Sequence, residues 1–159
     1  MIHGCLFRKF VIHLEGGEFR FDHRNENLQK VIEKLLKNET PLLCAFPEEP
    51  DGMIRDYVYV KDIVQANVIA LERGGNVCVN IGTGEGTTTG CLLREISKQM
   101  NKEYNHIKAE PRNGDIRRSC LNVSKAKHVL NWKPTFSLST GVSFTIKYFM
   151  GQEVATYSK

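Results

Sequence analysis

The sequence of 159 residues has no cysteine pair at C-x-x-C spacing, no clustered histidines and no long apolar run. Its five cysteines are scattered and odd in number, and its five histidines show no metal-ligand spacing, so neither a zinc site nor a disulfide framework is indicated. Scattered single cysteines fit a reducing compartment. The missing apolar run excludes a membrane-spanning helix, and the first residues lack the pattern of a signal peptide. We therefore expect a cytoplasmic protein without a metal site or a membrane partner.

The chain also lacks a strong charge of one sign. Its net charge is +4 and charged residues make up 25% of it, without a basic stripe. This charge is too small for a nucleic-acid surface, but it is compatible with a small anionic ligand. A hydrophobic content of 41% at this length fits one soluble domain with a modest core.

Hydrophobic periodicity predicts helices that alternate with short strands, and hence an α/β fold that is too short for a complete doubly wound sheet. The residues divide into an unassigned leader (1–24), one lobe (25–150) and a tail (151–159). For the leader two interpretations stay open, namely two short strands around Gly16–Gly17 or no fixed structure. We expect five helices: at 25–38, from Asp62 to Gly74, after the glycine-rich turn 82–90, at 124–130, and from Ser139 or Thr140 onward. We expect strands at 42–46, 57–60, 77–81 and 106–109.

Two charged blocks carry the functional information. Residues 55–62 read R-D-Y-V-Y-V-K-D, and residues 111–132 read P-R-N-G-D-I-R-R-S-C-L-N-V-S-K-A-K-H-V-L-N-W. In the first block, the guanidinium of Arg55 can grip a diphosphate with two parallel hydrogen bonds. The alternative is an ordinary ion pair of Arg55 with Asp56 or Asp62.

The second block places Arg112 and Asp115 on a loop that Pro111 and Gly114 shape. A carboxylate can accept hydrogen bonds from ribose hydroxyls, and a guanidinium offsets phosphate charge. The alternative is a mutual ion pair of the two side chains at a turn.

The two blocks resemble the C-terminal part of the extended short-chain dehydrogenase/reductase family, the NAD-dependent nucleotide-sugar epimerases and dehydratases such as the UDP-glucose 4-epimerases. The resemblance covers roughly residues 26–149 and implies the substrate-side lobe of that fold. It implies that Arg55 contacts the diphosphate of a nucleotide sugar, that Arg112 binds the nucleotide and that Asp115 binds the ribose. Phe46, at the end of a predicted strand, would lie near a uracil or thymine base, although a phenylalanine there is usually core.

The cofactor half of that family is absent from the sequence. The turn G-T-G-E-G at residues 82–86 has the wrong spacing for a dinucleotide, because Thr87 stands where a glycine is needed, and we expect Thr87 or Thr88 to cap the next helix instead. The family also needs a Tyr-x-x-x-Lys pair. Tyr57 with Lys61 and Tyr104 with Lys108 have that spacing, but neither stretch is predicted to be helical, so we interpret both as coincidence.

These features predict the nucleotide-sugar-binding portion of an NAD-dependent epimerase or dehydratase, with a UDP- or TDP-linked sugar as partner. Alone, the chain is expected to bind no NAD and to catalyse no hydride transfer. Alternatives are a non-catalytic binding or regulatory module and a structural remnant. We further expect Arg55 and Arg112 to face one cavity with Asp115. Because strands 57–60 and 77–81 are too apolar for open water, we expect self-association, a partner chain that supplies the missing half, or cover from residues 1–24.

Overall fold

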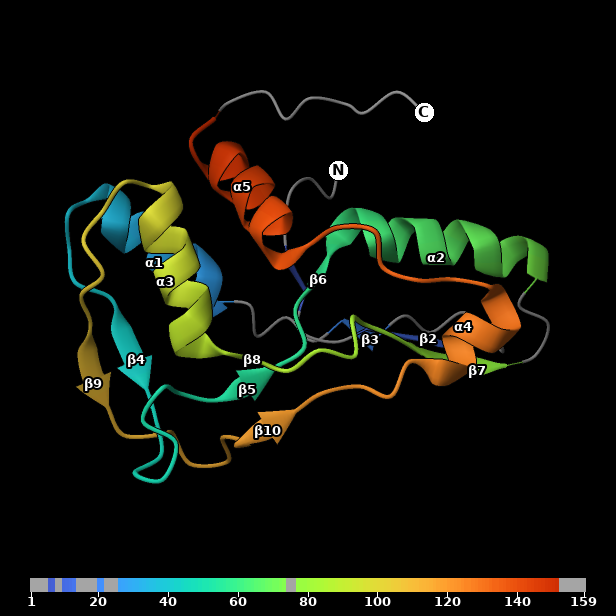
Figure 1. The fold of residues 1–159 in the computed structure, drawn as a ribbon, viewed down its shortest axis with the longest axis horizontal. Helices are drawn as coiled ribbons and strands as arrows, with labels where there is room; N and C mark the ends of the chain where they lie inside the picture. The colour runs from blue at the N-terminus through green and yellow to red at the C-terminus, as the bar shows by residue number, and fades with distance from the viewer. Residues whose placement is uncertain (1–5, 8–9, 14–19, 22–25, 74–76, 152–159) are drawn as a thin grey trace.

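The computed structural model describes residues 6–7, 10–13, 20–21, 26–73 and 77–151 of the 159. Within this part of the chain the helices lie above and beside a row of short strands (Figure 1). The helices are α1 (Glu26–Leu36), α2 (Val60–Arg73), α3 (Thr89–Gln99), α4 (Ser124–Leu130) and α5 (Leu138–Phe149).

The strands are short and form small separate sheets, with the orders β1-β6, β4-β9, β10-β5-β8 and β3-β2-β7. The pairs β4–β9 and β5–β10 are parallel, and the other pairs are antiparallel. This mixture of helices and strands confirms the predicted α/β class. The strands are β1 (Leu6–Phe7), β2 (Phe10–His13), β3 (Arg20–Phe21), β4 (Leu42–Cys44), β5 (Ile54–Arg55), β6 (Val58–Tyr59), β7 (Cys78–Ile81), β8 (Thr87–Thr88), β9 (Ile107–Ala109) and β10 (Arg118–Ser119).

One hydrophobic core lies among α1, α3 and α5. In α1, Leu28, Ile32 and Leu35 recur at helical spacing and are buried, so this face of the helix is held against its neighbours. The ring of Tyr59 packs against the rings of Phe136 and Phe144, with centroids 4.9 and 5.6 Å away. Such tilted aromatic pairs stabilise a core beyond their buried area, and they join β6 to the start of α5.

A second core lies at the other end of the molecule, where α2 and α4 cover β7 (Figure 1). Small residues of α2, Ala66 and Ala70, allow close approach to this strand and to α4. Trp132 is buried beside them, and its Nε1 donates a hydrogen bond to the backbone oxygen of Asp62 at 3.2 Å. The segment after α4 is thereby tied to the first turn of α2.

Most predicted helices are present at the predicted places. The periodic segment 25–38 contains α1, and α4 begins and ends where the sequence predicts. Thr88 caps α3, since its hydroxyl accepts a hydrogen bond from the backbone N–H of Cys91 at 3.0 Å. The predicted strands at 42–46, 77–81 and 106–109 contain β4, β7 and β9.

Two predicted helix starts are wrong. α2 begins at Val60 rather than after a cap at Asp62, and the carboxylate of Asp62 accepts hydrogen bonds from the backbone N–H groups of Thr135 and Phe136 at 2.9 and 3.2 Å. α5 begins at Leu138, with Ser137 as its cap, rather than at the predicted Ser139 or Thr140. Asp62 binds a distant loop, and the Ser139 hydroxyl donates to the carboxylate of Glu95 on α3. Such side chains can cap a helix or bind elsewhere, and spacing alone does not separate the two uses.

The described strands of the first 24 residues pair with the lobe. β1 pairs with β6, and β2 pairs with β7, with Phe10 opposite Ile81 and His13 opposite Cys78. Val58, Tyr59 and Ile81 are buried. The structure thus shows backbone pairing of β6 and β7 with two N-terminal strands, and cover of their side chains by residues 1–24 stays a prediction. The predicted turn at Gly16–Gly17 and most of the predicted tail, residues 152–159, lie outside the described residues.

Candidate functional site

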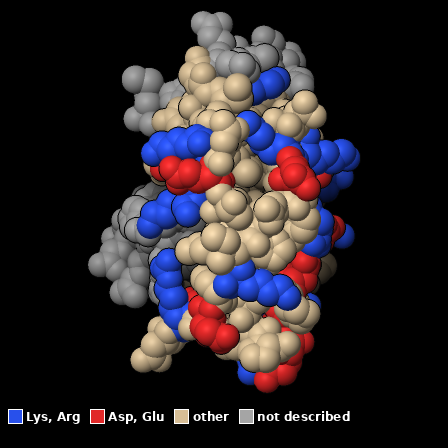
Figure 2. All heavy atoms as spheres, turned by 90° about the vertical axis from the view of Figure 1, so that its left-hand side faces the viewer, with Lys and Arg blue, Asp and Glu red and all other residues tan. Residues whose placement is uncertain are grey.

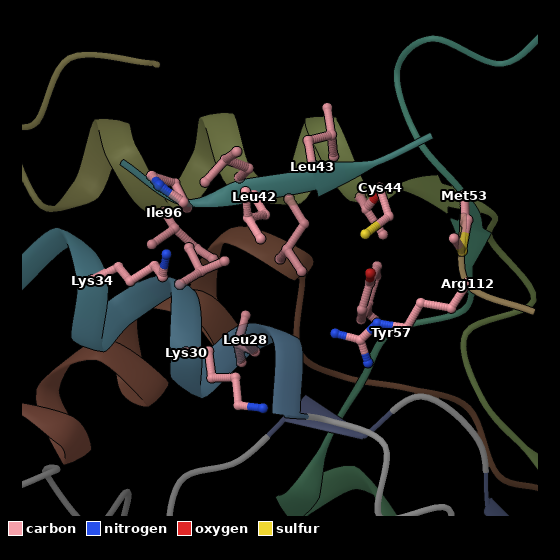
Figure 3. A pocket seen from close by; sticks show the side chains of 15 residues that line it. Leu28, Lys30, Lys34, Leu42, Leu43, Cys44, Met53, Tyr57, Ile96 and Arg112 are labelled. Carbon is pink, nitrogen blue, oxygen red and sulfur yellow. The ribbon is translucent and has the colours of Figure 1, made fainter. Parts of the chain in front are cut away.

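A cavity of about 130 Å³ lies between α1, β4 and the N-terminal half of α3 (Figure 3). Its wall is mostly apolar and includes Leu28, Val31, Leu43, Met53, Leu92 and Ile96. An apolar cavity of about 150 Å³ holds one benzene ring, whereas sites for whole drug-sized ligands measure about 300–1,000 Å³. The cavity can therefore enclose a single ring, and the rest of a larger ligand would lie across its rim.

The cations that line the cavity are Lys30 and Lys34 of α1 and Arg112 of the loop before β10. Figure 3 shows the guanidinium of Arg112 next to Tyr57, reaching toward α1 and the side where Lys30 lies. The amine of Lys34 is 3.4 Å from the backbone oxygen of Thr40. An apolar recess with positive charge at its edge suits a ring that carries an anionic substituent. Neither lysine belongs to the two charged blocks at residues 55–62 and 111–132, which is why the sequence did not indicate them as site residues.

Arg55, the first predicted ligand residue, is buried with 5% of its surface exposed and is not among the residues that line this cavity. Its Nη1 donates to the backbone oxygens of Ile54 and Arg117 at 2.7 and 3.3 Å, and its Nη2 lies 3.1 Å from the sulfur of Met53. Arg55 thus joins β5 to the end of the 111–117 loop and contacts a residue of the cavity wall. Its predicted contact with a diphosphate stays a prediction.

Arg112 and Asp115 contact each other through the backbone of Arg112 rather than through a side-chain ion pair. The carboxylate of Asp115 accepts a hydrogen bond from the backbone N–H of Arg112 at 2.8 Å, and the backbone N–H of Asp115 donates to the oxygen of Arg112 at 3.0 Å. Gly114 has φ +85°, which favours glycine at this turn. The turn presents the Arg112 side chain to the cavity, while Asp115 does not line it. The predicted convergence of Arg55, Arg112 and Asp115 is therefore not found at this cavity.

Phe46, the predicted base contact, follows β4 and also lies outside the cavity lining. The guanidinium of Arg117 lies over its ring, 4.6 Å from the centroid, and makes an ion pair with Glu48 at 3.3 Å. A guanidinium stacks well on an aromatic face. The face of Phe46 under Arg117 is therefore occupied by the protein itself, and its contact with a base stays a prediction.

The segment 51–53 is joined to the first turn of α3, which gives the cavity one of its walls. The guanidinium of Arg94 donates to both carboxylate oxygens of Asp51 at 2.6 and 2.8 Å, and the backbone N–H groups of Thr89 and Gly90 donate to the oxygens of Met53 and Asp51 at 2.9 Å. The Arg94 hydrogen bond is the main reason that the pKa of the Asp51 carboxyl lies below its ordinary value, and the Thr88 hydroxyl acts in the same direction. Met53 and Thr89 are therefore held side by side on the cavity.

The glycine-rich turn after β7 is filled by a carboxylate of the chain itself. Asp56 is buried and accepts hydrogen bonds from the backbone N–H groups of Thr83, Gly84 and Leu121 at 2.8, 2.9 and 3.3 Å, and from the Thr83 hydroxyl at 2.6 Å. A dinucleotide turn needs such N–H groups free for the pyrophosphate. The residues of this turn therefore do not fit NAD, in agreement with the spacing argument.

The described residues provide neither a metal site nor a membrane-spanning helix. Among the described residues no group of three or more His, Cys, Asp or Glu side chains is placed to hold a metal ion. In the same part of the chain no helix has the length and apolar character needed to cross a membrane. On the side of the molecule that carries α1, α3, β4 and β9, basic and acidic side chains are interspersed around uncharged surface (Figure 2). A small anion would therefore meet a few individual cations on this side rather than a broad basic surface.

The amino-acid sequence matches one family model and several curated proteins. The family model described as GDP-mannose 4,6 dehydratase matches residues 25–145. A putative UDP-glucose 4-epimerase of Methanocaldococcus jannaschii is 36% identical over 118 residues, which are 74% of this chain and 36% of that protein. A UDP-glucose 4-epimerase of Rhizobium meliloti is 41% identical over 90 residues, 54% of this chain and 27% of that protein.

Solved structures give the same result. The structure of UDP-glucose 4-epimerase from Thermotoga maritima with UDP-glucose is 35% identical, has a TM-score of 0.69, and is matched over 78% of this chain and 39% of its own. The structure of the UDP-glucose 4-epimerase from Thermus thermophilus with NAD is 33% identical and has a TM-score of 0.70. The match covers 83% of this chain and 43% of that chain. The fold and the matched segment thus define an α/β lobe of the epimerase and dehydratase type. The chain belongs to the family of NAD-dependent nucleotide-sugar epimerases and dehydratases, and it spans about two fifths or less of the length of these relatives.

Proposed function

We propose that this chain binds a nucleotide sugar, with the ring of the base in the cavity and the diphosphate over its rim. The observation that carries the proposal is the apolar cavity between α1, β4 and α3 with Lys30, Lys34 and Arg112 at its edge. A flat, weakly polar ring gains from burial against Leu, Ile and Met side chains, and the attached diphosphate gains from the cations. The T. maritima relative, whose structure holds UDP-glucose, supports a uridine nucleotide as the first ligand to test.

The four residues predicted from the sequence differ in how directly they would contact the ligand. Arg112 contacts the phosphates directly, because its side chain lies on the cavity. Asp115 shapes the turn that presents Arg112, and its proposed contact with a ribose would use the carboxylate oxygen that the turn does not. Arg55 and Phe46 would contact the ligand only after Arg117 leaves the Phe46 ring and the loop carrying Arg112 shifts.

We infer further that the chain does not carry out hydride transfer alone. The structure of the T. thermophilus relative contains NAD. In this chain the turn at residues 82–86 does not offer free N–H groups to such a cofactor, because those of Thr83 and Gly84 donate to the carboxylate of Asp56. A complete enzyme would need a cofactor-binding partner chain or segment. A non-catalytic nucleotide-sugar-binding module would share the cavity and need no such partner.

Calorimetric titration with UDP and UDP-glucose tests the binding proposal. We expect saturable binding that weakens as salt is added, since the phosphates meet exposed cations. Arg112→Ala should weaken it roughly tenfold or more, because hydrogen bonds to charged groups contribute about 1.5–3 kcal/mol. Arg73→Ala removes the same charge at the end of α2, outside the cavity lining, and serves as the matched control. Absence of binding to both ligands, or equal losses in both variants, would refute the proposal.

A further inference from the structure

Thr89, the first residue of α3, lines the cavity beside its apolar wall. Its Oγ1 is buried and has no hydrogen-bond partner among the described residues, although the oxygen of Met53 accepts from its backbone N–H. A buried hydroxyl without a partner destabilises the folded chain, so proteins rarely keep one without a reason. The neighbouring Thr88 differs, because its hydroxyl both donates to Asp51 and accepts from Cys91.

The surroundings of Thr89 explain where its hydroxyl lies. Oγ1 is turned toward Gly52, whose φ is +84°, and a Cβ at Gly52 would collide with it. Rotation about the Cα–Cβ bond of Thr89 exchanges the hydroxyl with the methyl group. Threonine in a helix populates more than one such rotamer. Since Oγ1 makes no hydrogen bond toward Gly52, turning it into the cavity breaks none.

We propose that Thr89 is a specificity-determining residue, whose hydroxyl turns into the cavity and hydrogen-bonds a polar edge atom of the enclosed base. The inference rests on the proposed nucleotide-sugar function and names the group that recognises its base end. Lys30, Lys34 and Arg112 recognise charge, and the Leu, Ile and Met side chains recognise only shape. Of the polar side chains that remain, Tyr57, Cys44 and Thr89, only Thr89 has a buried hydroxyl without a partner among the described residues. A carbonyl oxygen of a pyrimidine, the base of a uridine nucleotide, would give the Thr89 hydroxyl an acceptor that no described residue provides.

This proposal predicts opposite effects on stability and binding for one substitution. Thr89→Val keeps the shape and removes the hydroxyl, so the unliganded chain should melt about 2–4 °C higher, because the unsatisfied group is gone. The same variant should bind UDP about 5- to 10-fold more weakly, the loss expected for one hydrogen bond. Thr89→Ser retains the hydroxyl and should bind UDP within about twofold of the wild type.

Thr87→Val is the matched control, because it makes the same change two residues away and outside the cavity lining. The double variant Thr89→Val with Arg112→Ala completes the experiment. If the two residues contact opposite ends of UDP, their fold changes should multiply within about twofold. Strong departure from that product would place the Thr89 effect at the diphosphate and overturn the base assignment.

The failures are distinguishable. Unchanged UDP affinity in Thr89→Val, or an equal loss in Thr87→Val, overturns the role of the hydroxyl and leaves the nucleotide-sugar proposal standing. A wild-type chain that binds no UDP refutes the proposed function and this inference together. A lower melting temperature in Thr89→Val would also contradict the inference, because it would show that the hydroxyl is already satisfied without a ligand.

Discussion

Two buried carboxylates, Asp56 and Asp62, determine how distant loops meet in this chain. Asp56 holds the turn after β7 and the start of the segment after β10, and Asp62 holds the loop before α5. Each accepts at least two backbone hydrogen bonds from segments more than 20 residues away in the sequence. A charged group is tolerated inside a protein when its oxygens are satisfied in this way.

The first prediction at this scale concerns Asp56. Asp56→Ala leaves the N–H groups of Thr83 and Gly84 without their acceptor, so the free energy of unfolding should fall by about 3 kcal/mol or more. Urea denaturation followed by circular dichroism measures the change. Glu72→Ala, an exposed acidic position on α2, is the control and should stay within about 0.5 kcal/mol of the wild type. A loss below about 1 kcal/mol for Asp56→Ala would show that water replaces the carboxylate.

The second residue prediction is a pH dependence. The hydrogen bond from the Arg94 guanidinium lowers the pKa of the Asp51 carboxyl in the folded chain below its ordinary value of 3.8. The ionised carboxylate therefore stabilises the fold at pH values above 3.8. This stabilisation is lost as the pH falls through the lower pKa of the folded chain. Because both side chains are more than a third exposed, the gain should be less than about 1 kcal/mol. Wild type should exceed Asp51→Asn in unfolding free energy at neutral pH, and the gap should close in acid. A gap that is constant with pH would contradict this.

At the scale of elements, the N-terminal strands complete the edges of the lobe. β1 and β2 provide the backbone partners of β6 and β7, which would otherwise present unpaired N–H and C=O groups. We predict that a chain beginning at residue 25 is less stable and associates with itself, which size-exclusion chromatography with light scattering measures. The full chain is the comparison. A shortened chain that is monomeric and equally stable would show that these strands contribute nothing to the fold.

The elements also show what the sequence could and could not predict. α1 and α4 follow from periodicity, because each buries one face, and the cap at Thr88 follows from residue type. Asp62 and Arg55 could not be assigned in the same way, because the backbone groups that they bind come from segments more than 60 residues away. Nor does spacing reveal that Arg112 lines the cavity while Asp115 lies outside its lining and shapes the turn. For these residues the tertiary partner decides the role.

At the scale of the whole molecule, the chain corresponds to one part of a larger family fold. The matched relatives are about twice as long as this chain, and the glycine-rich turn of this chain is occupied by Asp56. We therefore predict that the purified chain, supplied with NAD and UDP-glucose, forms no UDP-galactose. Chromatography of the nucleotide sugars after prolonged incubation is the measurement, with a complete UDP-glucose 4-epimerase as the positive control. Turnover that copurifies with the chain through successive columns would contradict the prediction.

The central claim is that the cavity between α1, β4 and α3 holds the base of a nucleotide sugar. Titration of the ¹⁵N-labelled chain with UDP, followed by backbone amide NMR, tests it most directly because it locates the ligand. We expect saturable shifts at Leu28, Val31, Leu43, Cys44, Thr89 and Leu92, and small shifts in α2 and α4. Shifts confined to α2, α4 and β7, or no shifts at millimolar UDP, would contradict it.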